Sequence, residues 1–157
     1  MNKTTTEPNG SDNETERTLV PVDGSELSFR AVEHACIEHS ETEITVVHVL
    51  ESPTSGVYES LTGGSSGDFE DSERERRIEV EELLEEATAL ADEHGVSVST
   101  ETLSGNVANA ILTYAEETDT DRIVIGRSGR TSIERTLLGS VTESVSDQAE
   151  IPVTIVR

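Results

Sequence analysis

The sequence predicts an α/β fold, in which helices cover both faces of a doubly wound, five-stranded parallel sheet with strand order 3-2-1-4-5. Two observations favour this class. Short runs rich in Val, Ile and Thr alternate with longer segments of helical periodicity, which is the pattern of βαβ units. The right-handed crossovers that join such units favour an open, doubly wound sheet. A chain of 157 residues suffices for one such domain with a sizeable core.

Five short segments have the composition of buried strands, with Val, Ile and Thr prominent. They are Thr18 to Val22, Glu43 to Leu50, Val96 to Thr102, Arg122 to Ile125, and Val153 to Val156. Pro21 lacks a backbone donor, so we expect it near the end of its strand, where the neighbouring strands diverge.

Four segments have helical periodicity. They span about Ser25 to His39, about Ser72 to His94, about Asn106 to Glu117, and a stretch that begins near Ser140. The first has Ser25 as its expected N-cap and an inward stripe of Ala31, Val32, Ala35 and Cys36. The second is amphipathic and ends at Gly95. Ser140 and Glu143 match a capping box at the start of the fourth.

Two segments read as irregular. Residues 1–16 form a polar run that we expect to be a disordered tail in front of a domain over residues 17–157. Residues 51–71 contain many Gly and Ser, which predicts a mobile loop, either functional or a plain spacer. The polar tail resembles neither a secretory signal nor a transit peptide, and the lone Cys36 fits a reducing compartment, so we expect a cytoplasmic protein.

The net charge of -22, from 33 acidic and 11 basic side chains, argues against nucleic acid and anionic membranes as partners. Ile44 to Leu50 is the longest apolar run and falls far short of the ~20 residues that span a bilayer. Lys3 is the single lysine and aromatic residues make up 3%. This composition favours an origin in a salt-rich cytoplasm, where screening relieves repulsion between carboxylates.

A glycine-rich stretch after the fourth predicted strand points to a bound phosphate. Ligands of doubly wound sheets bind beyond the carboxyl ends of the strands, which selects Asp23, His48 to Leu50, and Gly126 onward. Gly139 and Ser140 lie where a helix begins, with its unpaired amides and positive dipole end. Arg122, Arg127, Arg130 and Arg135 concentrate positive charge around this loop, which favours an anion over chance pairing with surface carboxylates.

The stretch from Gly126 to Ser140 resembles the C-terminal motif of ATP-binding universal stress proteins, Gly-x2-Gly-x9-Gly-Ser/Thr. Gly126, Gly129, Gly139 and Ser140 match every fixed position and both spacings. Thr18 to Ser25 and Thr45 to Leu50 resemble the first two strands of the family, so the similarity covers about Thr18 to Arg157. It implies the doubly wound fold of the adenine nucleotide alpha hydrolase type, and a stress-response module that binds ATP.

The resemblance also implies site residues. Pro21, Asp23 and Val49 would hold the adenosine end of ATP. Backbone amides and hydroxyls around the triphosphate would come from Gly126, Ser128, Gly129, Gly139, Ser140 and Val141, with Mg2+ or Mn2+ between phosphate oxygens. Many members have Ser-His after the first glycine, where this chain has Arg127-Ser128, so the charge of Arg127 or Arg130 would replace an imidazole contact.

Other readings of these residues are weaker or remain open. A receiver domain needs a site lysine that this chain lacks, a flavodoxin needs a Thr/Ser-rich loop after the first strand, and a P-loop needs Gly-Lys-Ser/Thr. A related module that binds a partner and no nucleotide remains open. So does a slow ATPase, or self-phosphorylation on Ser128, Thr131 or Ser132.

The remaining candidate residues have structural readings. His34, His39 and His94 lack ligand partners at metal-binding spacing, and His48 is either a packed strand residue or a neighbour of adenine. Cys36, Phe29 and Tyr114 read as core. The last strand would lie at the edge of the sheet, and the resemblance also points to a homodimer that joins two copies of strand 153–156.

Overall fold

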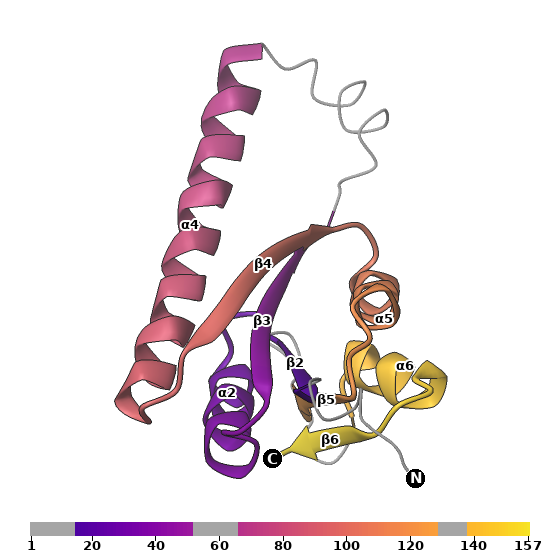
Figure 1. Cartoon of the computed structure of the whole chain (residues 1–157). Helices are drawn as coiled ribbons and strands as arrows, with labels where there is room; N and C mark the ends of the chain where they lie inside the picture. Colours follow the sequence, from indigo (N-terminus) through magenta and orange to yellow (C-terminus); the bar gives the residue numbers. More distant parts are fainter. Residues whose placement is uncertain (1–14, 52–65, 129–137) are drawn as a thin grey trace, which may run out of the picture.

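The computed structural model describes residues 15–51, 66–128 and 138–157 (Figure 1). Its five strands are β2 (Arg17–Pro21), β3 (Glu43–Leu50), β4 (Val98–Ser104), β5 (Arg122–Gly126) and β6 (Val153–Val156). They lie in the order β4-β3-β2-β5-β6, and every neighbouring pair is parallel. This order is the predicted 3-2-1-4-5, so the fold class is confirmed.

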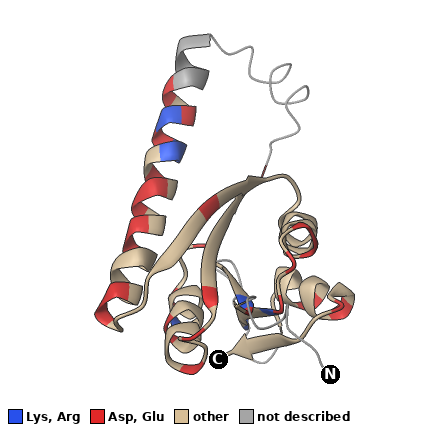
Figure 2. Cartoon of the chain, in the orientation of Figure 1, with Lys and Arg blue, Asp and Glu red and all other residues tan. Residues whose placement is uncertain are grey.

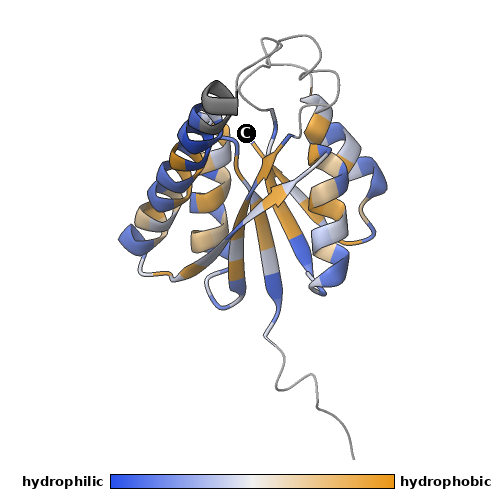
Figure 3. Ribbon diagram, turned by 90° about the horizontal axis from the view of Figure 1, so that it is seen from above, coloured by the Kyte–Doolittle hydropathy of each residue, from blue (hydrophilic) through white to orange (hydrophobic). Residues whose placement is uncertain are grey.

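Among the described residues, four helices cover the two faces of the sheet. They are α2 (Glu26–Glu38), α4 (Ser66–Glu93), α5 (Val107–Glu117) and α6 (Ser140–Gln148). α2 and α4 pack on one face with a core that includes Val20, Val46 and Val124. α5 and α6 pack on the other face, where Leu19, Val47 and Ile123 are buried. Successive strand residues thus face opposite cores, and Figure 3 shows the apolar strands enclosed by helices with polar outer surfaces.

The helix boundaries confirm some capping predictions and overturn one. The side chain of Ser25 accepts a hydrogen bond from the Ser28 amide, as expected of the N-cap of α2. The capping box at Ser140 is wrong, because Gly139 is the N-cap of α6 and Ser140 is its first helical residue. No side chain in the described part of the chain caps α6. Within the helix itself, the first amides of α6 have no intrahelical partners.

Other boundaries also differ from the prediction: β2 spans Arg17–Pro21 instead of Thr18 to Val22, β4 ends at Ser104 instead of Thr102, and β5 ends at Gly126 instead of Ile125. α4 begins at Ser66, so residues 66–71 of the predicted loop are helical, and residues 52–65 lie outside the described residues. Its first turns are charged and carry no apolar stripe, which is why periodicity missed them. β4 begins at Val98 instead of Val96, because the Val96 amide donates to Ala91 O and belongs to the turn that ends α4.

Pro21 occupies the position that its missing donor requires. It is the last residue of β2 and pairs with Val47 on the β3 side. The Val22 amide donates to Val47 O, so the alternating amides of a parallel strand place position 21 toward β5. The ladder between β2 and β5 pairs only Thr18 and Leu19 of β2, and therefore ends before the proline. The predicted reason for tolerating Pro21 is confirmed.

Polar contacts at the amino ends of the strands hold Glu16, which precedes β2, against the starts of β3 and β5. Arg122 Nη2 lies 3.1 Å from Glu16 Oε1, and Arg122 Nη1 lies 3.4 Å from His39 Nδ1. The Glu43 amide also donates to Glu16 O, so this residue, assigned above to the tail, is bound to the domain. Burial, then the Arg122 guanidinium and the His34 ring, hold the pKa of His39 below its ordinary value, against the opposing carboxylates of Glu41 and Glu38.

The lowered pKa of His39 predicts a loss of stability in mild acid. Since the unfolded chain takes up this proton more readily, the contribution is complete above the ordinary pKa of 6.5 and declines as the pH falls through it. We expect His39→Gln to flatten the dependence of the urea midpoint on pH between about pH 7 and 5. Arg122→Gln, which removes the neighbouring cation, should also flatten it. Identical slopes in wild type and His39→Gln would contradict this assignment.

Candidate functional site

The sheet opens at the carboxyl ends of β2 and β5, its two central strands. Their pairing stops at Leu19 and Ile123, before either strand ends. The chain leaves β2 through Val22 and Asp23 toward α2 on one face, whereas α6, which follows β5, lies on the other (Figure 1). This divergence is the topological switch point at which doubly wound sheets bind ligands. Asp23 and the residues after Gly126 border it.

Gly126 joins three elements at this edge. A Cβ atom on this buried residue would lie 3.0 Å from both the carbonyl carbon and the oxygen of Leu27, in the first turn of α2. From the other face, Thr142 of α6 donates its buried hydroxyl to Gly126 O at 2.7 Å. The glycine is therefore needed for close packing of α2 on β5. The sequence predicted that the missing side chain of Gly126 makes room for a ligand. In the structure, the space where its Cβ would lie is filled by the backbone of α2.

The ends of the glycine-rich stretch are tied together. The Arg127 amide donates to Val156 O at 2.8 Å, and the Gly139 amide donates to Arg127 O at 2.9 Å. The Gly139 amide is thus engaged within the fold and holds α6 beside β5. Ser140, which is exposed, and the half-buried Val141 follow in the first turn of α6, where helix geometry leaves amides without intrahelical partners. Ser128 is half-buried directly after Arg127.

Asp23 and Val49 lie at the ends of adjacent strands. Asp23 is half-buried, and its Oδ1 accepts a hydrogen bond from the Ser25 amide at 2.9 Å across Gly24, whose φ is 87°. This turn fixes the carboxylate at the carboxyl edge. The Val49 side chain is 7% exposed and belongs to the α5 core, so the backbone of Val49 is the part that a ligand would meet.

His48 links the two strands beneath this edge, a role that sequence reasoning did not identify. Its Nδ1 lies 2.8 Å from Val22 O. Since a carbonyl only accepts, Nδ1 carries the proton in this contact. Val22 precedes Asp23 and His48 precedes Val49, so the bond sets the spacing between both predicted adenosine contacts. The partners are 26 residues apart, and no local spacing could have revealed them.

The prediction that Arg122 lies with the other arginines around the glycine-rich stretch is wrong. Arg122 starts β5 and contacts Glu16 and His39 at the amino ends of the strands, so it lies at the opposite end of the sheet from the glycine stretch. Arg127 is half-buried at the start of that stretch. Gly129, Arg130, Thr131, Ser132 and Arg135 fall outside the described residues.

A surface groove of about 370 Å³ lies elsewhere, between the end of β4 and the outer side of α5. Asn106, Asn109 and Tyr114 are among its lining residues, and none of the predicted site residues is. Burial, with the nearby Glu101 carboxylate, raises the pKa of Tyr114. In the described ranges, no group of three or more His, Cys, Asp or Glu side chains is arranged to hold a metal ion. No helix there combines the length and apolarity needed to cross a membrane.

Comparison with known proteins agrees with the motif and the topology. The model of the universal stress protein family matches residues 14–157. The chain belongs to the universal stress protein family. It is 35% identical over 142 residues to universal stress protein MJ0531 of Methanocaldococcus jannaschii, covering 88% of this chain and 80% of that one. The family resemblance of the sequence is thereby confirmed.

Solved structures share the fold. Hypothetical protein MJ0577 superimposes with a TM-score of 0.72 at 26% identity, over 90% of this chain and 95% of that one. A universal stress protein in complex with cAMP gives 0.65 at 23% identity, covering 92% and 98%. One from Archaeoglobus fulgidus in complex with dAMP gives 0.63 at 23%, covering 91% and 98%. These likenesses establish the common architecture of the universal stress protein domain.

The junction at Gly126 predicts a stability effect of Thr142. Thr142→Val keeps the shape of the side chain and removes its hydroxyl, which leaves the buried Gly126 carbonyl without this donor. We expect a loss of about 1–3 kcal/mol in the free energy of unfolding, measured by urea denaturation at constant salt. Thr142→Ser retains the hydroxyl and should lose clearly less. Equal losses in both variants would show that the bond does not hold α6 to β5.

Proposed function

We propose that this universal stress protein binds an adenine nucleotide, ATP in the first instance, at the opening between β2 and β5. The observation that carries the proposal is the convergence of the Asp23 turn, the Arg127–Ser128 backbone and the uncapped start of α6 on the carboxyl ends of the central strands. Relatives of this fold in complex with cAMP and dAMP support an adenine nucleotide as the ligand.

The adenosine end would lie over the ends of β2 and β3. Pro21 terminates β2 and has no amide hydrogen, Asp23 presents a fixed carboxylate, and Val49 presents backbone groups beside it. A carboxylate is suited to accept hydrogen bonds from ribose hydroxyls, as acidic residues do in other dinucleotide folds. The bond from His48 to Val22 O keeps these elements at one spacing.

The phosphates would lie toward β5 and α6. The amides of Ser140 and Val141 come from a helix start that carries no side-chain cap among the described residues, and such a terminus favours an anion. Ser128 and Gly129 would add contacts by family resemblance, and Arg127 would supply positive charge. Gly126 and Gly139 then serve chiefly as the scaffold, because one is packed against Leu27 and the other donates its amide to Arg127 O.

A divalent cation would be held through the nucleotide itself. Mg2+ is commonly bound by substrate phosphates with one or two carboxylates and several waters, so no dedicated cage of protein ligands is needed. This agrees with the lack of a ready-made metal cluster in the described ranges. We therefore expect Mg2+ or Mn2+ to strengthen binding of ATP more than binding of AMP.

The proposed role is regulation through occupancy. Asp23 is engaged by the Ser25 amide, which suits binding better than proton abstraction. Two other functions are tested by the same protein. A module that binds a partner without nucleotide predicts no heat with ATP. Slow hydrolysis, or self-phosphorylation of Ser128, Thr131 or Ser132, predicts labelled phosphate or labelled protein with ATP under saturating metal.

A negative charge introduced at the phosphate loop tests the proposal. We expect wild type to bind ATP in calorimetry at high potassium chloride, which screens the net charge of -22. Gly129→Glu should weaken ATP binding at least tenfold, because a carboxylate there repels the phosphates. Thr113→Glu, an exposed position on α5, is the matched control and should bind like wild type. A folded wild type that binds no nucleotide would favour the partner-only function.

We also propose that two copies pair through β6. This strand is at the edge of the sheet, and all four of its residues are half-buried. The Ile123 amide donates to Pro152 O and the Arg127 amide donates to Val156 O, so alternation directs the backbone groups of Val153 and Ile155 away from β5. Those groups are available to a second strand.

A proline at the outer edge tests this pairing. Val153→Pro removes a donor that faces away from β5 and leaves the ladder to β5 intact. We expect a dimer for wild type and a shift toward monomer for the variant, measured by light scattering at high salt. Ile37→Ala, at an exposed position on α2, should leave the dimer unchanged. A wild type that is monomeric at working concentration would exclude the pairing.

A further inference from the structure

The long helix α4 extends past the carboxyl ends of β3 and β4 (Figure 1). Its buried stripe consists of Val80, Leu84, Ala87 and Ala91, which pack on α2 and the sheet. Continuing that stripe toward the start of the helix gives Arg77, Arg76 and Glu73, which are three, four and seven residues before Val80. The side of α4 that is apolar where it packs on the sheet is therefore charged where the helix extends beyond the carboxyl ends of the strands.

Arg76 is anchored at that edge. Its Nη2 donates to Glu51 O at 3.2 Å. Glu51 directly follows β3 and lies two residues beyond Val49, a separation of about 6.6 Å along an extended chain. A guanidinium has five N–H donors in a planar fork, and this contact uses one of them. The anchored group is thus within a side chain's length of the strand end to which the adenosine is assigned.

The charge of this overhang is notable in so acidic a chain. Arg74, Arg76 and Arg77 supply three of the 11 basic side chains, and Figure 2 shows basic positions among acidic ones on the part of α4 beyond the sheet. The three are exposed, and none lies on the phosphate side of the opening, which is formed by β5 and α6. In the proposed orientation of the nucleotide, a cation at the β3 side would lie nearer the base than the triphosphate.

We propose that the guanidinium of Arg76 packs against the purine base of the bound nucleotide and contributes to the affinity for the adenosine end. This inference rests on the proposed nucleotide site and adds a contact from α4 to it. A planar, weakly hydrated cation is favoured on the face of an aromatic ring, and the bond to Glu51 O holds it in place beforehand. Affinity for the base would thus come partly from α4, a helix that follows β3 in the chain and packs on the sheet.

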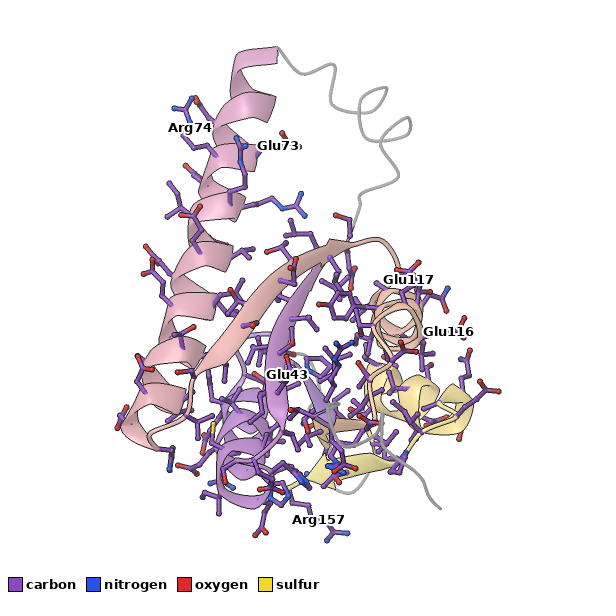
Figure 4. The ribbon with its side chains drawn as sticks, in the orientation of Figure 1. Glu43, Glu73, Arg74, Glu116, Glu117 and Arg157 are labelled. Carbon is purple, nitrogen blue, oxygen red and sulfur yellow. The ribbon has the colours of Figure 1, made fainter. Side chains whose placement is uncertain are left out.

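Three probes separate a contact to the base from a general effect of charge. Wild type, Arg76→Gln and Arg74→Gln are titrated with ATP, adenosine and tripolyphosphate by calorimetry at one fixed salt concentration. Arg74 is the matched control, because it is on the same turns and Figure 4 shows it on the side of α4 away from the sheet. We expect Arg76→Gln to lose about five- to tenfold in affinity for ATP and adenosine alike. Tripolyphosphate binding, and all binding by Arg74→Gln, should be unchanged.

Each other result overturns the assignment. Equal affinity of Arg76→Gln and wild type for adenosine would exclude the contact while leaving the nucleotide site in place. A loss confined to ATP and tripolyphosphate would assign Arg76 to the phosphates instead of the base. A folded wild type that binds neither ATP nor adenosine would refute the proposed function itself. Circular dichroism and the thermal midpoint confirm that each variant keeps the helix.

Discussion

The packing of two helices on the end of β5 is the constraint on which the rest of the structure depends. Gly126 allows the first turn of α2 to sit where a Cβ would otherwise be, and its carbonyl accepts the buried hydroxyl of Thr142 from α6. Helices from opposite faces of the sheet are thereby fixed to one residue. The Gly139 amide adds a second tie to Arg127 O. The start of α6 and the turn before α2 consequently have defined positions relative to the central strands.

The few basic side chains of this acidic chain lie at both ends of the sheet. Arg122 lies at the amino ends of the strands, where it contacts Glu16 and His39. Arg127 lies at the opposite end, half-buried beside the glycine stretch, and Arg76 is anchored on Glu51 O across the same edge. Cations therefore border the carboxyl edge from both β3 and β5. In a chain of net charge -22, these cations reduce the repulsion that an anionic ligand would meet at this edge.

Much of the fold could be predicted from local patterns, whereas contacts across the fold could not. Strands rich in Val, Ile and Thr are recognisable from their composition, and the predicted bounds of β3 and β6 agree with the structure to the residue. The first turns of α4 were missed because residues 66–71 are, apart from Phe69, Ser, Gly and acidic residues without the spacing of an apolar stripe. Arg122 was placed near the glycine stretch by its sequence position, yet a five-residue strand separates the two ends of the sheet. The bond from His48 to Val22 O joins strands, and no spacing along the chain encodes it.

The proposed site would be built largely from backbone groups, so it would depend on its glycines more than on its side chains. The amides at the start of α6 keep their direction whatever the side chains at Ser140 and Val141 are, provided that Gly126 and Thr142 hold the helix in place. Side chains such as Arg127 can then differ from the family pattern without rebuilding the site. In the proposed site, further contacts to a nucleotide would come from groups around this frame. The structure offers such groups at the β3 side, where His48 fixes the turn before Asp23 and α4 brings Arg76 to the strand end.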